Sequence, residues 1–178
     1  MKQTLSTLIA ALTFLVVAAV PAAAQSTQGG DDAARVGAGF MLLNWIDSDS
    51  TAKGLAVDFS QPVNLGGSRN WSIIGDLLWG KDDDETDFAV GGGVRFTTAA
   101  GGRARVYGQA HVGVVRWSIS DCCDDSAFYF APGGGVLFPI TDRVDFKGQI
   151  DLYLPNWDGY TDKLFRVFLG VSFQVGQR

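Results

Sequence analysis

The chain has 178 residues, of which 47% are hydrophobic and 19% charged, with 14 Lys and Arg against 19 Asp and Glu. Its formal net charge of −5 argues against a nucleic-acid partner, because an acidic protein repels phosphate backbones. Beyond residue 24 no apolar run of about 18 residues remains, so transmembrane helices are not expected. Any membrane span must therefore be built from β-strands.

Residues 1–24 have the layout of a secretory signal peptide. Met1 and Lys2 give a positive start, the stretch from Leu5 to Val20 is almost entirely apolar, and a run of small residues ends at Ala24. A short apolar stretch before an A-x-A cleavage site favours a cleaved leader over a permanent anchor of about 20 residues. Cleavage also removes Lys2 and so changes the formal charge from −5 to −6. Residues 25–34 are polar and Gly-rich, which predicts a flexible lead.

Residues 35–178 are predicted to form one all-β domain. Eight segments of about ten residues alternate between apolar and polar side chains, which is the period of a strand with two unlike faces. Val36, Phe40 and Leu42 share one face of the first segment, for example, while Arg35 lies on the other. The predicted strands are 35–45, 54–60, 71–79, 88–97, 106–117, 128–138, 144–154 and 164–175. An even number of such strands, with no other block of sequence, predicts a closed antiparallel up-and-down barrel.

The alternation does not decide which face of the sheet points outward. A soluble barrel of the lipocalin kind would turn its apolar face inward. Aromatic residues at the strand ends favour a transmembrane barrel instead, because such barrels carry aromatic girdles at both interfaces. Trp71 and Trp79 share a face, as do Phe88 and Phe96, and each pair spans roughly 20 Å of the bilayer normal in a strand tilted by about 40°. Three more aromatics lie at or just beyond strand ends, namely Trp45, Tyr153 and Trp157.

The connections between the predicted strands alternate in charge. Those after the first, third, fifth and seventh strands hold twelve of the 19 acidic residues, and in an up-and-down barrel these four connections share one rim. The twelve are Asp47, Asp49, Asp82, Asp83, Asp84, Glu85, Asp87, Asp121, Asp124, Asp125, Asp158 and Asp162. Membrane barrels have short turns at one end and longer external loops at the other, so the acidic rim is predicted to be external.

Three motifs extend this pattern. Gly133-Gly134-Gly135-Val136 runs into Pro139-Ile140-Thr141-Asp142-Arg143, and the chain closes with an alternating strand from Gly170 to Val175. With these motifs, residues 35–175 resemble the small outer-membrane β-barrels of the opacity-protein and OmpA-transmembrane-domain type, often grouped as porin-family proteins. The resemblance implies an outer-membrane barrel whose last strand is read by the barrel-assembly machinery. Phe168, where a polar residue is usual, and the final Gly176-Gln177-Arg178 depart from that closing signal.

The polar face of the predicted strands carries a balanced set of four basic and four acidic residues. They are Arg35, Arg95, Lys147 and Arg166 with Asp58, Asp76, Asp145 and Asp151. An eight-stranded barrel has an interior just wide enough for side chains, and hydrogen-bonded ion pairs would fill it. The sequence therefore predicts a plugged or very narrow lumen and not a general porin.

His111, the only histidine, is the one candidate for catalysis. A lipid-modifying enzyme of the esterase type would need a nucleophile and an acid beside it. Ser118 and Ser120 stand seven residues or more away along the chain. We therefore expect His111 to make a polar contact in the lumen, and we expect no enzyme.

Two features of the acidic connections are candidate binding sites. Asp82, Asp83, Asp84, Glu85 and Asp87 offer oxygen ligands for a weak external Ca²⁺ or Mg²⁺, but their spacing is not that of an EF-hand, and a solvated, mobile loop is the preferred interpretation. Cys122 and Cys123 are adjacent in a secreted chain, so a strained vicinal disulfide is expected first and a link to another molecule second. Two thiols are too few for the usual zinc site, and no other cofactor is predicted.

Together these features predict a non-enzymatic outer-membrane barrel that contributes to envelope structure or surface contact. Its surroundings would be outer-membrane lipid and lipopolysaccharide, and it would meet the barrel-assembly machinery during biogenesis. Two alternatives stay open: a soluble periplasmic lipocalin-like barrel that binds an apolar ligand, and an outer-membrane enzyme that modifies lipid.

Overall fold

The computed structural model describes residues 33–46, 50–98, 104–119, 123–157 and 159–176, without the side chain of residue 69. The predicted signal peptide and residues 25–32 of the predicted lead lie outside this part. The described residues form nine strands, namely β1 (Ala34–Trp45), β2 (Thr51–Leu65), β3 (Ser68–Asp82), β4 (Glu85–Thr97), β5 (Arg105–Ile119), β6 (Asp124–Pro139), β7 (Val144–Trp157), β8 (Tyr160–Thr161) and β9 (Leu164–Val175). None of these residues belongs to a helix long and apolar enough to cross a membrane.

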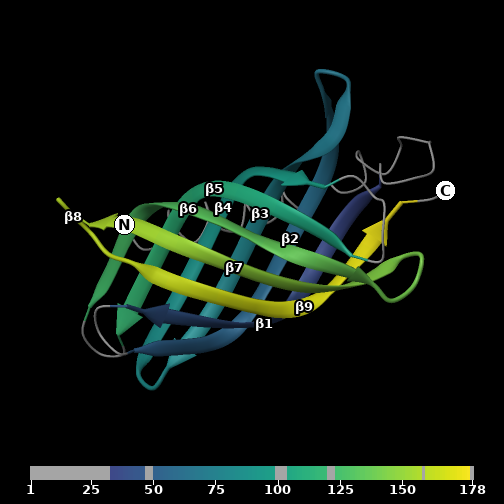
Figure 1. The fold of residues 1–178 in the computed structure, drawn as a ribbon. Coiled ribbons are helices and arrows are strands. Elements are labelled where there is room, and N and C mark those ends of the chain that lie inside the picture. The colour runs from purple at the N-terminus through teal and green to yellow at the C-terminus, as the bar shows by residue number, and fades with distance from the viewer. Residues whose placement is uncertain (1–32, 47–49, 99–103, 120–122, 158, 177–178) are drawn as a thin grey trace.

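Eight of the described strands close into an antiparallel barrel (Figure 1). From β1 to β7 each strand pairs with the next one along the chain, β7 also pairs with β9, and β9 pairs back with β1. The two-residue β8 folds back on the end of β7 within the last connection. The predicted eight-stranded up-and-down barrel is thus confirmed, and closure leaves it without a free sheet edge.

The strands are longer than their alternating stretches. Asp82 at the end of β3 pairs with Glu85 at the start of β4, so Asp83 and Asp84 alone form the turn. Two-residue hairpin turns place residues at positive φ, and Asp83 has a φ of 43°. The expected acidic loop was wrong at Asp82, which ends β3, and at Glu85 and Asp87, which belong to β4. Polar composition suggested a loop there, but the hydrogen bonds of a sheet join backbones and continue past the apolar stretch.

The hairpin between β2 and β3 turns at Gly66 and Gly67, which have φ values of 59° and 80°. Two successive residues at positive φ suit glycine, because it has no Cβ to clash. This hairpin projects beyond the neighbouring strands (Figure 1). We call this end of the barrel, with the connections β2–β3, β4–β5 and β6–β7, the turn end. The opposite end, with the connections β1–β2, β3–β4, β5–β6 and β7–β9, is called the acidic end.

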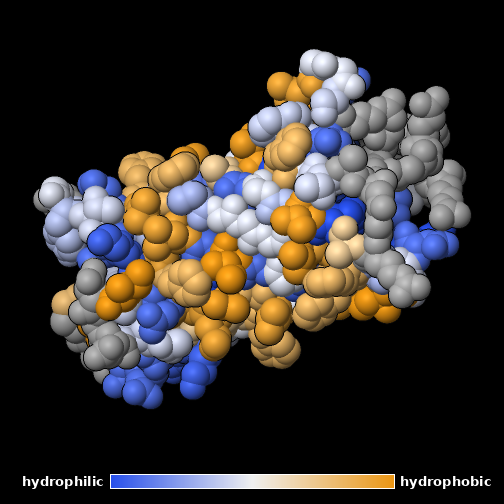
Figure 2. All heavy atoms as spheres, in the orientation of Figure 1, coloured by the Kyte–Doolittle hydropathy of each residue, from blue (hydrophilic) through white to orange (hydrophobic). Residues whose placement is uncertain are grey.

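The apolar face of the sheet points outward. Phe40 in β1 and Phe128 in β6 are 75% and 77% exposed, whereas Asp151 and Arg166 are fully buried. Figure 2 shows hydrophobic side chains along the middle of the visible wall and hydrophilic ones gathered near β8. The predicted orientation is confirmed. The lipocalin-like alternative is contradicted, because it would place these apolar side chains inside and the charges outside.

The interior is not polar throughout. Apolar side chains fill the lumen toward the acidic end in one cluster, which we call the apolar layer. Its members are Met41, Leu43, Ala52, Ala56, Leu78, Ala89, Val115, Ala127, Tyr129, Ala131, Tyr153, Trp157, Leu164 and Phe168. The expectation of a polar or small inner face was wrong here, because stretches such as Phe40-Met41-Leu42-Leu43 are apolar on both faces and show no contrast.

Candidate functional site

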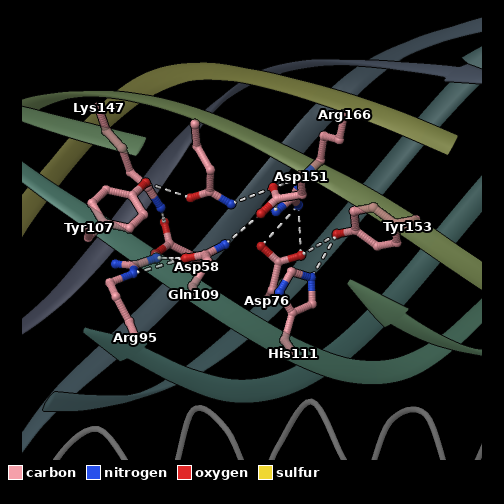
Figure 3. Close-up of polar contacts among 11 residues, drawn as sticks. Asp58, Asp76, Arg95, Tyr107, Gln109, His111, Lys147, Asp151, Tyr153 and Arg166 are labelled. Carbon is pink, nitrogen blue, oxygen red and sulfur yellow. Dashed lines mark hydrogen bonds and ion pairs between the residues drawn. The ribbon is translucent and has the colours of Figure 1, made fainter. Parts of the chain in front are cut away.

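Six charged side chains in the middle of the lumen form one connected network (Figure 3). Asp58 of β2 lies between two cations: its Oδ1 is 2.7 Å from Lys147 Nζ, and its Oδ2 accepts a hydrogen bond of 3.1 Å from Arg95 Nη2. Arg95 Nε and Nη2 also donate to Gln109 Oε1 at 3.0 and 2.9 Å. The Arg95 guanidinium lies 4.4 Å from the centre of the Tyr107 ring, where the negative ring face attracts it.

A second group surrounds Arg166 of β9. Its Nη1 donates to Asp76 Oδ1 and Oδ2 at 2.7 and 3.0 Å, and its Nε and Nη2 donate to Asp151 Oδ2 at 2.9 and 2.7 Å. Tyr153 Oη donates to Asp76 Oδ1 at 3.1 Å. Gln109 Nε2 joins the two groups by donating to Asp151 Oδ1 at 2.8 Å. The buried pairs therefore extend across the lumen through strands that are far apart in the sequence.

A third group lies at the turn end. Asp145 of β7 pairs with Arg35 of β1, and its Oδ2 is 2.8 Å from Arg105 Nη2. The structure thus brings all eight of the expected lumen charges into ion pairs with one another. Arg105 is an additional member that the sequence did not predict, because the recognisable alternation begins only at Val106. The one available signal was its inward parity, two residues before Tyr107 on the same strand face.

Aromatic rings complete the packing around these charges. Lys147 Nζ lies 5.1 Å from the centre of the Phe168 ring, and the Arg166 guanidinium lies 5.1 Å from that of Tyr153. Phe168 is 2% exposed, so the residue that departs from the family's closing pattern points into the lumen. Tyr107 Oη donates to Gln149 Oε1 at 2.8 Å. The interior is thus filled by rings and ion pairs together.

His111 lies inside the lumen and is 1% exposed. Its Nε2 is 3.2 Å from Tyr153 Oη, and its ring packs edge-on against Tyr129 and Tyr153. Ser118 Oγ instead donates to Asp124 Oδ1 at 2.5 Å, and Ser120 lies outside the described residues. The described residues therefore place a tyrosine, and not a serine, against the imidazole.

The four aromatics expected in the girdles lie on the outer face in two cross-strand pairs. Trp71 pairs with Phe96, with ring centroids 5.1 Å apart, and Trp79 pairs with Phe88 toward the acidic end. Their role at a membrane interface stays a prediction. The three other aromatics at strand ends do not support a girdle, because each faces the interior: Tyr153 is 1% and Trp157 6% exposed, and Trp45 packs against the apolar layer.

The acidic residues expected to bind a cation are spread over the hairpin of β3 and β4. Asp82 Oδ2 accepts hydrogen bonds from Ser50 Oγ and Thr51 N at 2.8 and 3.0 Å, while Asp87 points inward and is 1% exposed. In the described ranges, no three His, Cys, Asp or Glu side chains are grouped so as to hold a metal ion. Weak Ca²⁺ or Mg²⁺ binding by these five residues stays a prediction.

The cysteine pair is only partly described. Cys123 is disulfide-bonded, whereas Cys122 lies outside the described residues. Asp47, Asp49, Asp121 and Asp158 of the expected acidic rim lie outside them as well. The predicted vicinal disulfide between Cys122 and Cys123 therefore stays a prediction.

Comparison with known proteins places this geometry in a known class of folds. No family model matches the chain, and no curated protein matches its sequence. The crystal structure of Neisserial surface protein A matches with a TM-score of 0.65 at 12% identity, over 80% of this chain and 96% of that one. The outer membrane protein OprG from Pseudomonas aeruginosa matches with a TM-score of 0.59 at 11% identity, over 85% of this chain and 100% of that one.

The N-terminal β-barrel domain of Pseudomonas aeruginosa OprF matches with a TM-score of 0.58 at 14% identity, over 83% of this chain and 100% of that one. At such low identity the likeness concerns the fold. The chain has the fold of the small outer-membrane β-barrels, and the predicted resemblance is confirmed at that level.

Proposed function

We propose that this chain is a non-enzymatic outer-membrane β-barrel that contributes to envelope structure or surface contact and whose lumen is sealed. The observation that carries the proposal is the distribution of side chains, with large apolar residues exposed on the wall and charged residues buried inside. Hydrocarbon around the barrel accounts for both, because it solvates the apolar wall and makes a charged side chain on that wall costly. It also requires every backbone group to be paired, which the closed sheet achieves. The likeness in fold to outer-membrane proteins supports the same surroundings.

The sealed lumen is supported by two consecutive obstacles. The ion-paired network crosses the middle of the barrel, with Arg166 and Asp151 at 0% exposure. The apolar layer follows toward the acidic end, with Leu78 at 0% and Leu43 at 1% exposure. An ion that crossed would have to separate buried pairs and then pass an apolar constriction, and both steps are costly.

In this proposal the acidic end faces outward, beside the phosphates of lipopolysaccharide. Divalent cations would bridge its carboxylates to those phosphates, since both are hard oxygen ligands. The girdle aromatics Trp71, Trp79, Phe88 and Phe96 would lie at the two lipid interfaces. The barrel-assembly machinery would act on β9, the closing strand.

We propose no catalytic role for His111, because its Nε2 is engaged with Tyr153 Oη at 3.2 Å in a buried position. An enzyme of the lipid-modifying kind would need that nitrogen beside a nucleophile that substrate can reach. Replacing His111 with Asn and assaying lipid A composition tests this point. We expect no change in lipid A, whereas loss of a modification would support the enzyme instead.

The decisive experiment combines membrane fractionation, heat modifiability and single-channel recording of the refolded protein. We expect resistance to carbonate extraction, a shift in gel mobility between unheated and boiled samples, and no steady conductance in planar bilayers. Release by carbonate would contradict the membrane barrel. Large, steady currents would leave the membrane barrel intact and contradict the sealed lumen.

A further inference from the structure

A cavity of about 440 Å³ opens at the acidic end of the barrel. Three tryptophans from three strands line it: Trp45 at the end of β1, Trp117 near the end of β5 and Trp157 at the end of β7. The rings of Trp45 and Trp157 stack with centroids 6.4 Å apart and an angle of 26°. Trp157 belongs to the apolar layer, and Trp45 and Trp117 pack against it. We call this cavity the tryptophan mouth. Its three tryptophans are held in place by the barrel strands and by packing against the apolar layer.

The rest of the lining is mainly acidic. Three carboxylates, from Glu85, Asp125 and Asp162, face a single cation, Lys163. Ser50 and Tyr160 complete the lining. Trp117 Nε1 donates a hydrogen bond to Glu85 Oε2 at 3.4 Å, so the Glu85 carboxylate lies against the Trp117 ring. The lining therefore combines aromatic surface with an excess of negative charge.

A buried carboxylate adds to that charge. Asp87 lies on the inner face of β4, where it pairs with Trp117 of β5. It is 1% exposed, and its Oδ1 has no hydrogen-bond partner among the described residues. Trp157, at 6% exposure, likewise has an Nε1 without a partner in the described part of the chain. The Asp87 carboxylate therefore adds negative charge behind the wall of the mouth, beside Trp117.

We propose that the tryptophan mouth binds a small organic cation, such as a quaternary ammonium or a guanidinium compound. Tryptophan has the ring face that attracts cations most strongly, and aromatic cages are the usual receptors for alkylated ammonium groups. The carboxylates supply the complementary charge. The volume lies within the range of roughly 300–1,000 Å³ that small-molecule sites occupy. Binding at this mouth goes beyond the proposed envelope role. Because the apolar layer beneath the mouth closes the path inward, the mouth is a binding site and not the entrance to a channel.

Choline and its neutral carbon analogue 3,3-dimethylbutan-1-ol test the proposal directly, because the two differ mainly in charge. The full chain is labelled with ¹⁵N and refolded in a polyoxyethylene detergent, which carries no ammonium group. Indole N–H signals then report on all five tryptophans of the chain. We expect choline and guanidinium to shift the signals of Trp45, Trp117 and Trp157 saturably. Those of Trp71 and Trp79, on the outer wall, should not move.

Matched variants locate the site. Replacing Trp117 with Leu should weaken choline binding about two- to fivefold, the loss expected for one ring, whereas Trp71→Leu should leave it unchanged. The double variant Asp125→Asn/Asp162→Asn alters one exposed and one half-buried side chain and should also weaken binding, so it serves if Trp117→Leu does not fold. Heat modifiability checks the fold of each variant independently of binding.

Three outcomes would overturn the proposal. An equal response to the neutral analogue would make the mouth an apolar site. A saturable response to glucose but not to choline would make it a saccharide site. If the tryptophan signals of the folded protein responded neither to choline nor to glucose, the mouth would bind neither compound.

Discussion

At the scale of single residues, the middle of the lumen balances its charges between two groups. Asp58 lies between two cations, Arg95 and Lys147, whereas Arg166 lies between two carboxylates, Asp76 and Asp151. Taken alone, the group around Asp58 has one excess positive charge, and the group around Arg166 has one excess negative charge. Gln109 connects them, since its amide accepts from Arg95 and donates to Asp151. The balance therefore depends on the whole network and not on isolated pairs.

Arg166→Met tests this dependence. Removing the guanidinium leaves Asp76 and Asp151 buried without a counter-charge, and breaking a buried pair from one side typically costs about 3–5 kcal/mol. We expect a loss of that order in the free energy of unfolding, measured by urea titration in phospholipid vesicles. Arg116→Met is the control, because the Arg116–Asp124 pair is 36% and 50% exposed and should contribute less than about 1 kcal/mol. Equal losses in the two variants would contradict a stabilising network.

At the scale of elements, glycine on the inner face of a strand makes room for a charged side chain from its neighbour. A Cβ on Gly133 of β6 would lie 2.0 Å from Asp151 Oδ1, and one on Gly37 of β1 would lie 2.1 Å from Asp58 Oδ1. Both distances are far below contact. The glycines of these strands therefore serve the network, whose carboxylates occupy the space that a side chain would need.

Gly133→Ala should consequently displace Asp151 and weaken its hydrogen bond from Gln109. Overpacking of this kind costs about 1–3 kcal/mol, which urea titration would register as a lower unfolding midpoint. Gly108 of β5 offers a matched control on the outer wall, where an added Cβ meets nothing within 4 Å. We expect Gly108→Ala to leave the midpoint unchanged, and a comparable loss in both variants would mean that strand flexibility, not space in the lumen, is at stake.

At the scale of the whole molecule, the barrel is layered along its axis. Ion pairs occupy the turn end and the middle, the apolar layer comes next, and the tryptophan mouth opens at the acidic end. Around this filled interior lies an apolar wall. Two separate contributions therefore stabilise the folded barrel. One comes from the polar contacts buried in the lumen, and the other comes from contact between the apolar wall and lipid.

Phe40→Arg tests the wall. Phe40 lies in the middle of β1 and is 75% exposed, so the new charge would face the centre of the hydrocarbon. Arginine at that depth costs about 2–4 kcal/mol of folding free energy, falling to about 0–1 near the interfaces. Leu65→Arg is the control, because Leu65 is 56% exposed beside the turn of the β2–β3 hairpin. In vesicles only Phe40→Arg should lower stability appreciably; if neither did, the wall would not be in contact with lipid.

The eight strands could be predicted from the sequence because they rest on local contrast between neighbouring residues. Alternation within each strand, as in Trp71 to Trp79, distinguishes its two faces without knowledge of any partner strand. Contrast fails where both faces are apolar, and for that reason the apolar layer was missed at Met41 and Leu43. It also fails at strand ends, where Trp45 and Trp157 support a girdle by their position in the sequence although they line the mouth.

The sequence by itself determined the strand number and eight of the lumen charges, because both follow from the parity of residues along one strand. It determined the outward face through a second signal, the aromatic residues at strand ends, because parity alone does not say which face meets lipid. Only the tertiary structure decided which charges meet. Asp76 and Arg166 are 90 residues apart, and the register between strands, together with closure of β9 on β1, brings them into contact. The tryptophan mouth arises in the same way, since its three rings come from strands whose ends adjoin only in the closed barrel.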